Sequence, residues 1–130
     1  MFILDTNTLI YFFKGIGNVS QNLLSKPPRD IGIPTIVLFE LEVGIAKSGS
    51  PRKRMKQLQD LMETVHILSF GPSEARAAAT IRAQLERKGM IIGPCDILIS
   101  GTALAQHAIL VTHNVREFGR IPRLQVEDWY

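Results

Sequence analysis

The chain alternates short apolar segments with longer segments that have the pattern of amphipathic helices, and this alternation is its strongest constraint on the fold. A short apolar run bounded by turn residues is typical of a buried strand, whereas apolar positions that recur every three or four residues indicate a helix. Strands that alternate with helices favour a parallel sheet with helices on both faces. We therefore expect an α/β fold of three layers, with a central, mainly parallel sheet flanked by helices.

The expected elements follow one another without a repeat, a linker or a low-complexity segment. A chain of 130 residues has the length of one domain, so we expect a single domain over residues 1–130. Thr35, Ser50 and Ser73 are expected N-caps. The predicted strands are 1–4, 30–34, 64–70, 108–112 and 124–126, and the predicted helices are 7–14, 20–24, 35–47, one that begins at 51 and includes 62, 73–88 and 94–107.

Composition excludes several classes of protein. The chain is 45% hydrophobic and 21% charged, which is typical of a globular domain and not of a disordered one. No apolar run reaches the roughly 18 residues that a membrane span needs, and we expect no signal peptide and no membrane partner. The lone Cys95 excludes an internal disulfide, which fits a cytoplasmic location. The net charge of +3 favours a polyanionic partner.

Three acidic residues stand in apolar surroundings. Asp5 follows the first predicted strand, Glu40 lies inside an apolar helix, and Asp96 begins another. Charged groups are rarely buried unless they are paired or bind a cation. In a parallel sheet, functional residues collect at the carboxyl ends of the strands. We therefore predict that Asp5, Glu40 and Asp96 converge on one metal site at that edge.

Oxygen ligands of this kind suit Mg²⁺ or Mn²⁺. Clustered carboxylates repel one another and raise at least one pKa, and a bound divalent ion relieves that repulsion. The ion can also activate a water molecule and stabilise the charge that develops on a phosphodiester. The predicted reaction is hydrolysis of a phosphodiester bond by an activated water.

Each acid also has a purely structural interpretation. Asp5 is a natural N-cap for the helix that follows, a role compatible with metal binding. Glu40 has a rival in Glu42, and helical periodicity does not separate them because both have apolar neighbours. Asp96 could serve as a negative charge at the amino end of a helix.

Other polar residues lie near these positions in the sequence. Thr6 and Asn7 follow Asp5 and could hydrogen-bond the carboxylates or a metal-bound water, although turn chemistry explains them equally well. Thr112, Asn114 and Glu117 follow the apolar strand at 108–112. Asn114 could offer a neutral oxygen and Glu117 a fourth carboxylate, with an ordinary loop and helix cap as the alternative.

A dense basic run begins the fourth predicted helix. Arg52, Lys53 and Arg54 could contact nucleic-acid phosphates, since neutralised phosphates supply most sequence-independent affinity. A solvated helix face is the commoner role of such a run, and we favour it.

Several segments, taken together and in order, resemble the motifs of PIN-domain ribonucleases of the VapC toxin type. They are FILDTN at 2–7, TIVLFELEVG at 35–44, GPCDILI at 93–99, LVTHN with REF at 110–118, and VEDW at 126–129. Each motif alone is weak, but their order and spacing over nearly the whole chain are specific. In the second motif the acid precedes Leu and, four positions on, Gly, which selects Glu40 over Glu42.

The resemblance implies a PIN fold and Mg²⁺- or Mn²⁺-dependent cleavage of RNA, with Asp5, Glu40 and Asp96 as metal ligands and Asn114 as a further catalytic residue. It implies the toxin role in a toxin–antitoxin pair, inhibited by a VapB-like antitoxin that inserts a peptide into the active site. Relatives commonly form homodimers, bind promoter DNA through the antitoxin, and in some cases cut transfer RNA.

One position departs from the family pattern. Many PIN domains have a fourth acid where this chain has Asn114. Glu117 or a water could take its place, so we expect one tightly held ion rather than two. Some relatives share the Asn, and activity is expected to persist.

Two other functions deserve comparison. A haloacid-dehalogenase-like phosphatase would use Asp5 as its nucleophile, but that chemistry needs an acid two residues later, where Asn7 stands. A catalytically silent binding module could use the same sheet edge to hold a partner. A nucleophilic pair of Cys95 and His113 rests on residue type alone, and Cys95 is more typical of a small buried residue.

Overall fold

The computed structural model describes residues 1–130 and contains one five-stranded sheet in which every pair of neighbours is parallel. The strands run in the order β3-β2-β1-β4-β5. The prediction of an α/β fold is confirmed, and the sheet is entirely rather than mainly parallel. The strands are β1 Phe2–Leu4, β2 Ile31–Pro34, β3 His66–Leu68, β4 Ile109–Val111 and β5 Gln125–Glu127.

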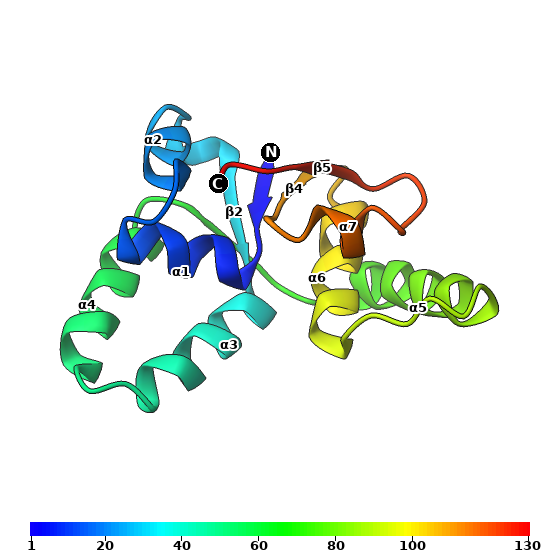
Figure 1. The fold of residues 1–130 in the computed structure, drawn as a ribbon, viewed down its shortest axis with the longest axis horizontal. Helices are drawn as coiled ribbons and strands as arrows, with labels where there is room; N and C mark the ends of the chain where they lie inside the picture. Colours follow the sequence, from blue (N-terminus) through cyan, green and yellow to red (C-terminus); the bar gives the residue numbers. More distant parts are fainter.

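Helices cover both faces of this sheet. Figure 1 shows α1, α3 and α4 on one side of the strands and α5 and α6 on the other. This three-layer arrangement follows from the strand order, because right-handed crossovers to the left and to the right of β1 place their helices on opposite faces. The helices are α1 Thr6–Lys14, α2 Val19–Leu24, α3 Thr35–Ala46, α4 Pro51–Met62, α5 Pro72–Arg87, α6 Pro94–Ala105 and α7 Val115–Phe118, with a 3₁₀ turn at Pro28–Asp30.

Some predicted boundaries are wrong. The third strand keeps only His66–Leu68 of the predicted 64–70, because β3 is an edge strand that pairs with β2 alone. The N-cap of α3 is Pro34 and not Thr35, and the N-cap of α5 is Gly71 and not Ser73.

Local features explain why α5 begins at Pro72 and why the sequence did not predict α7. At α5 the Glu74 carboxylate accepts a hydrogen bond from the Gly71 N–H at 2.9 Å, so the first helical residue is Pro72. Helix α7 was not predicted because four residues are too few to show a helical period.

The central strands lie in the middle of the hydrophobic core. Ile3 and Leu4 of β1 and Leu110 and Val111 of β4 are fully buried, within a core cluster of 23 residues. The chain runs from β1 outward in one direction and then returns to form β4 on the other side of β1. This reversal makes the carboxyl ends of β1 and β4 the place where α/β sheets open a crevice. None of the helices combines the length and apolar character needed to cross a membrane.

Helices α5 and α6 pack closely through Gly101. A Cβ at this position would lie 2.6 Å from the Ala78 Cβ and 2.8 Å from the Ala78 backbone nitrogen. Gly44 in α3 offers a matched contrast, because a Cβ there would meet nothing within 4 Å.

We predict opposite effects of alanine at these two glycines. Gly101→Ala should lower the free energy of unfolding by about 1–3 kcal/mol because the backbones of α5 and α6 must separate. Gly44→Ala should raise it by about 0.5–1 kcal/mol because alanine favours the helix. Urea unfolding of both variants measures this, and a neutral Gly101→Ala would contradict the close packing of the two helices.

Candidate active site

The predicted site residues gather at the carboxyl ends of β1 and β4. Asp5 follows β1 directly, and its backbone N–H donates to the Val111 carbonyl of β4 at 3.1 Å. Because Leu4 stands opposite Val111 in the parallel register, the residues after both strands emerge side by side. Asp5 and Thr112 therefore lie at the same point of the sheet edge.

Asp5 is buried, with 5% of its surface exposed. Its Oδ1 accepts a hydrogen bond from the Thr8 N–H at 2.9 Å, so Asp5 is the N-cap of α1 as the sequence allowed. Burial raises the pKa of Asp5, and the charge of Glu40 adds to this, while hydrogen bonds from Thr112 and Thr8 oppose it. Asp5 therefore caps α1 and at the same time interacts electrostatically with Glu40.

Glu40 is half-buried on α3 and faces the start of α1. The Thr6 hydroxyl donates to its Oε1 at 2.6 Å, which is the interaction expected of a supporting residue. Glu42, two residues later on the helix, is exposed. The structure therefore places Glu40 and not Glu42 at the site.

Asp96 lies half-buried in the first turn of α6. Burial raises the pKa of Asp96 to about 6, and the negative charges of Glu117, Glu40 and Asp5 contribute in that order. Asp5, Glu40, Asp96 and Glu117 thus form one electrostatically coupled group, hereafter the acidic cluster.

Asn114 and Glu117 complete the rim of the cluster beside α7. The Asn114 amide donates to the Glu117 carboxylate, and the Asn114 backbone N–H donates to the Thr112 hydroxyl at 3.0 Å. Asn114 therefore orients Glu117, the acid that affects Asp96 most strongly among its charged neighbours. Asn7 is exposed and makes no side-chain hydrogen bond.

The donor atoms of the acidic cluster suit a hard divalent cation, since all are carboxylate oxygens with an amide oxygen nearby. Burial raises the pKa of Asp96 most, and the negative charges of Glu117, Glu40 and Asp5 raise it further; a bound cation would offset the repulsion among these charges. The side chains do not form a closed cage: no group of three His, Cys, Asp or Glu residues is placed so that it could hold a metal ion. Close convergence of the three predicted ligands is therefore not observed.

Cys95 belongs to the site, although its sequence context alone did not show this. Burial raises the pKa of its thiol, as do the charges of Glu40 and Asp96 and a hydrogen bond to Glu40. A thiol in such surroundings is a poor nucleophile. His113 instead bonds to Asp128 at 3.0 Å and stacks on Tyr130, so the Cys95–His113 pair is not formed. The only sequence signal was the position of Cys95 next to Asp96.

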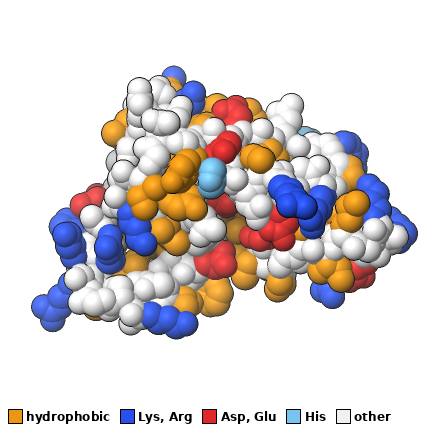
Figure 2. All heavy atoms as spheres, viewed as in Figure 1, with side chains coloured by type: hydrophobic (Ala, Val, Ile, Leu, Met, Phe, Trp, Pro, Cys, Tyr) orange, Lys and Arg blue, Asp and Glu red, His pale blue; other side chains and the backbone are white.

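A groove of about 330 Å³ continues from Glu40 between α1, α3 and α4. Lys14 and Arg54 line it, whereas Arg52 and Lys53 are exposed on α4. Gln57 also lines the groove, and its Oε1 is the one buried side-chain oxygen or nitrogen without a hydrogen-bond partner. Figure 2 shows acidic side chains across the middle of this face, with basic side chains on both flanks.

Comparison with known proteins agrees with this fold. The family model described as PIN domain matches residues 2–124. Ribonuclease VapC2 of Rickettsia felis is 35% identical over 99% of this chain and 98% of its own length. The tRNA(fMet)-specific endonuclease VapC of Salmonella typhimurium is 34% identical over 98% of this chain and 97% of its own length.

A solved structure gives the same result. The structure of VapBC2 from Rickettsia felis bound to a DNA fragment from its promoter superposes with a TM-score of 0.92 at 35% identity, over 99% of this chain and 98% of that one. The chain belongs to the PIN-domain family and, within it, to the VapC group.

We predict that the acidic cluster makes stability depend on pH. The pKa of Asp96 is higher in the folded chain than its ordinary value of 3.8, so the folded state binds this proton more tightly. Stability should therefore fall as pH rises from about 4 to about 6. Asp96→Asn removes this loss and should raise the Tm of the metal-free protein by roughly 2–5 °C at pH 7.5, with little change at pH 4.

Thermal unfolding followed by circular dichroism at both pH values measures the effect. Glu42→Gln, at an exposed position in the middle of α3, is the matched control and should leave Tm unchanged at either pH. An equal rise for Asp96→Asn at both pH values would contradict the electrostatic origin.

Proposed function

We propose that this chain is a divalent-metal-dependent endoribonuclease and the toxin component of a toxin–antitoxin pair. The observation that carries the proposal is the acidic cluster at the reversal point of the sheet, where burial and three other acids raise the pKa of Asp96. The relatives named ribonuclease VapC2 and tRNA(fMet)-specific endonuclease support RNA as the substrate and transfer RNA as the first to test.

Asp5, Glu40 and Asp96 would hold Mg²⁺ or Mn²⁺, with Asn114 or Glu117 completing the site directly or through water. When bound, the ion activates a water molecule and stabilises the charge that develops on the phosphodiester.

The remaining residues fix these groups in place. Thr6 holds the Glu40 carboxylate, and Thr8 and Thr112 hold that of Asp5. Asn114, the residue directly before α7, fixes Glu117 through its side-chain amide. Helices α3 and α6 pack against each other and α1 packs on α3, so the backbone sets the three acids around the same end of the sheet.

The groove beside Glu40 supplies a path for the RNA backbone. Lys14 and Arg54 line it and can neutralise phosphates next to the acids, which would otherwise repel the substrate. Arg52 and Lys53 lie outside the groove and would add only long-range attraction.

Partners follow from the solved complex. By analogy with the DNA-bound VapBC2 of Rickettsia felis, this chain would bind a VapB-like antitoxin and reach promoter DNA through it. We also propose a homodimer. Phe39 on α3 is 60% exposed beside Glu40, and Val43 is exposed one turn later. These side chains offer an apolar contact for a protein partner close to the acidic cluster.

We predict that Asp5→Asn abolishes RNA cleavage and leaves the fold intact. Asparagine caps a helix as well as aspartate does, but it removes a negative ligand. Cleavage of transfer RNA in Mg²⁺ should fall by at least about 100-fold, with an unchanged circular dichroism spectrum. Calorimetry with Mn²⁺ should show binding to the wild type that is lost in Asp96→Asn.

Asp60→Asn is the matched control, since Asp60 lies on α4 in an exposed pair with Lys56. Full activity of purified Asp5→Asn would overturn the assignment. A phosphoaspartate trapped at Asp5 would support the phosphatase instead, and a wild type that binds no Mn²⁺ and cuts no RNA would support a silent binding module.

A separate prediction concerns the groove. Arg54→Ala should raise KM for RNA several-fold and reduce the slope of log affinity against log salt by about 1, because one phosphate contact is lost. Lys56→Ala is the control, because Lys56 points to Asp60 outside the groove and should leave both quantities unchanged. Equal effects of the two changes would indicate general charge attraction rather than a path through the groove.

A further inference from the structure

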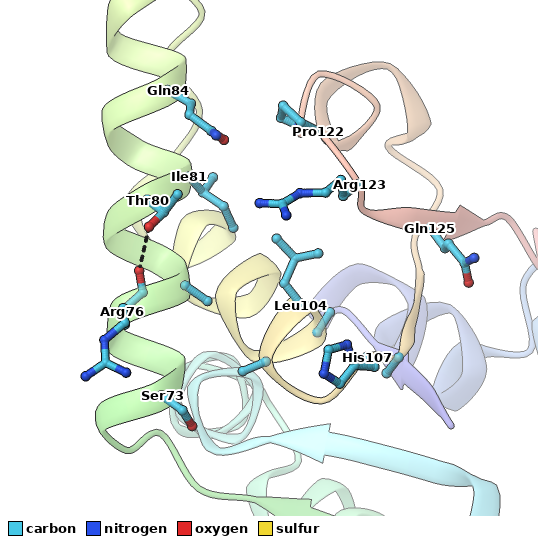
Figure 3. A pocket seen from close by; sticks show the side chains of 14 residues that line it. Ser73, Arg76, Thr80, Ile81, Gln84, Leu104, His107, Pro122, Arg123 and Gln125 are labelled. Carbon is cyan, nitrogen blue, oxygen red and sulfur yellow. Dashed lines mark hydrogen bonds between the residues drawn. The ribbon is translucent and has the colours of Figure 1, made fainter.

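A second pocket lies at the opposite ends of the strands from the acidic cluster. It has a volume of about 470 Å³ and lies between α5, the end of α6 and the turn before β5 (Figure 3). His107 precedes β4 and Arg123 precedes β5, so both come from the amino ends of the strands. The acidic cluster lies at the carboxyl ends of the strands, so the two sites are at opposite ends of the sheet.

The lining of this pocket is basic. It includes Arg76, His107 and Arg123 but no Asp or Glu. None of these three residues takes part in the ion pairs of the protein, which are Lys56–Asp60, Arg82–Glu86 and His113–Asp128. Figure 3 shows the Arg123 guanidinium directed across the pocket toward α5, whereas Arg76 points away from it. Arg123 and His107 are therefore the cationic and hydrogen-bonding groups available to a ligand.

His107 stands in a backbone conformation that favours glycine. Its φ is +52°, and its N–H donates to Leu104 O while the N–H of Ala108 donates to Ala103 O. Helices α1 and α5 end in the same pair of hydrogen bonds, with Gly15 and Gly89 at the corresponding position and φ of +67° in both. Of the three helices that end this way, only α6 has a residue other than glycine at this position. The side chain of that residue, His107, lines the pocket.

Arg123 likewise has a positive φ where glycine is favoured, in this case in a turn. The N–H of Leu124 donates to Ile121 O at 3.4 Å, Pro122 occupies the second position, and Arg123 has a φ of +66°. This pattern describes a type II turn, whose third position favours glycine. His107 and Arg123 are the only non-glycine residues of the chain with positive φ, and both line one pocket. Unfavourable backbone of this kind concentrates at functional sites.

We propose that this pocket binds the phosphate ester of a nucleotide, through Arg123 and His107. A planar guanidinium matches two phosphate oxygens, and an imidazole N–H can donate to a third. The apolar side chains of Ile81, Leu104 and Pro122 give a surface for a base. Gln84 points into the same space and offers an amide for its edge. The volume lies in the range of small-molecule sites.

The ligand is a nucleotide phosphate, supplied either as a free mononucleotide or as part of an RNA strand. The site does not depend on the nuclease assignment, because none of its residues belongs to the acidic cluster. Binding can therefore be tested without metal, where no cleavage is expected.

The test is an NMR titration of the ¹⁵N-labelled full chain in EDTA with three probes: inorganic phosphate, a nucleoside 5′-monophosphate and a short single-stranded RNA. We expect saturable amide shifts at residues 107 and 123 and along α5. A response to the monophosphate identifies a free nucleotide, and a response to the RNA alone identifies a strand. If no probe shifts these amides in a saturable way, the proposal is wrong.

Two glycine variants separate ligand binding from folding. His107→Gly and Arg123→Gly remove the donors and relieve the backbone, so affinity should fall at least about tenfold while Tm stays equal to or above that of the wild type. Arg87→Ala, at the exposed end of α5 and outside the pocket, is the control and should change neither. Unchanged affinity in both glycine variants, or a marked loss of Tm in both, would overturn the proposal.

Discussion

The pairing of β1 with β4 is the interaction on which the acidic site depends. Both strands are buried on both faces, and buried backbone groups must find hydrogen-bond partners, so the register in which Leu4 opposes Val111 is strongly fixed. That register puts Asp5 beside Thr112 and opens the crevice where the strand order reverses. Helices α3 and α6 then pack against the sheet and each other, which brings Glu40 and Asp96 to the same edge.

The two ends of the strands gather side chains of different kinds, acidic at the carboxyl ends and basic at the amino ends. At the carboxyl ends, burial and the charges of neighbouring carboxylates raise the pKa of Asp96, which makes the charged form unfavourable without a cation. At the amino ends, His107 and Arg123 occupy positions that favour glycine and face one pocket without an acidic partner. In both places local stability is reduced, as is common where groups are arranged for a ligand. The modest net charge of +3 hides this separation of charge.

Much of the fold could be predicted because local rules and long-range packing agree. Asp5 caps α1, as the sequence indicated, and the helix ends at Lys14, as predicted. The prediction failed where a neighbour in space decides the outcome. The strand at 64–70 is shortened because β3 has only one partner, and α5 begins at Pro72 because Glu74 reaches back to Gly71. Helix α7 is too short to have a period.

The sequence by itself determined the alternation of strands and helices, and the motifs that contain Asp5, Glu40 and Asp96. These features are local, since periodicity and spacing act within a few turns of the chain. Tertiary structure decided which groups interact. Only the packed helices put Cys95 against Glu40, set Glu117 beside Asp96, and leave Glu40 half-buried while Glu42 is exposed. The basic pocket likewise exists only after folding, because its charge and shape come from α5, α6 and a turn that are distant in the chain.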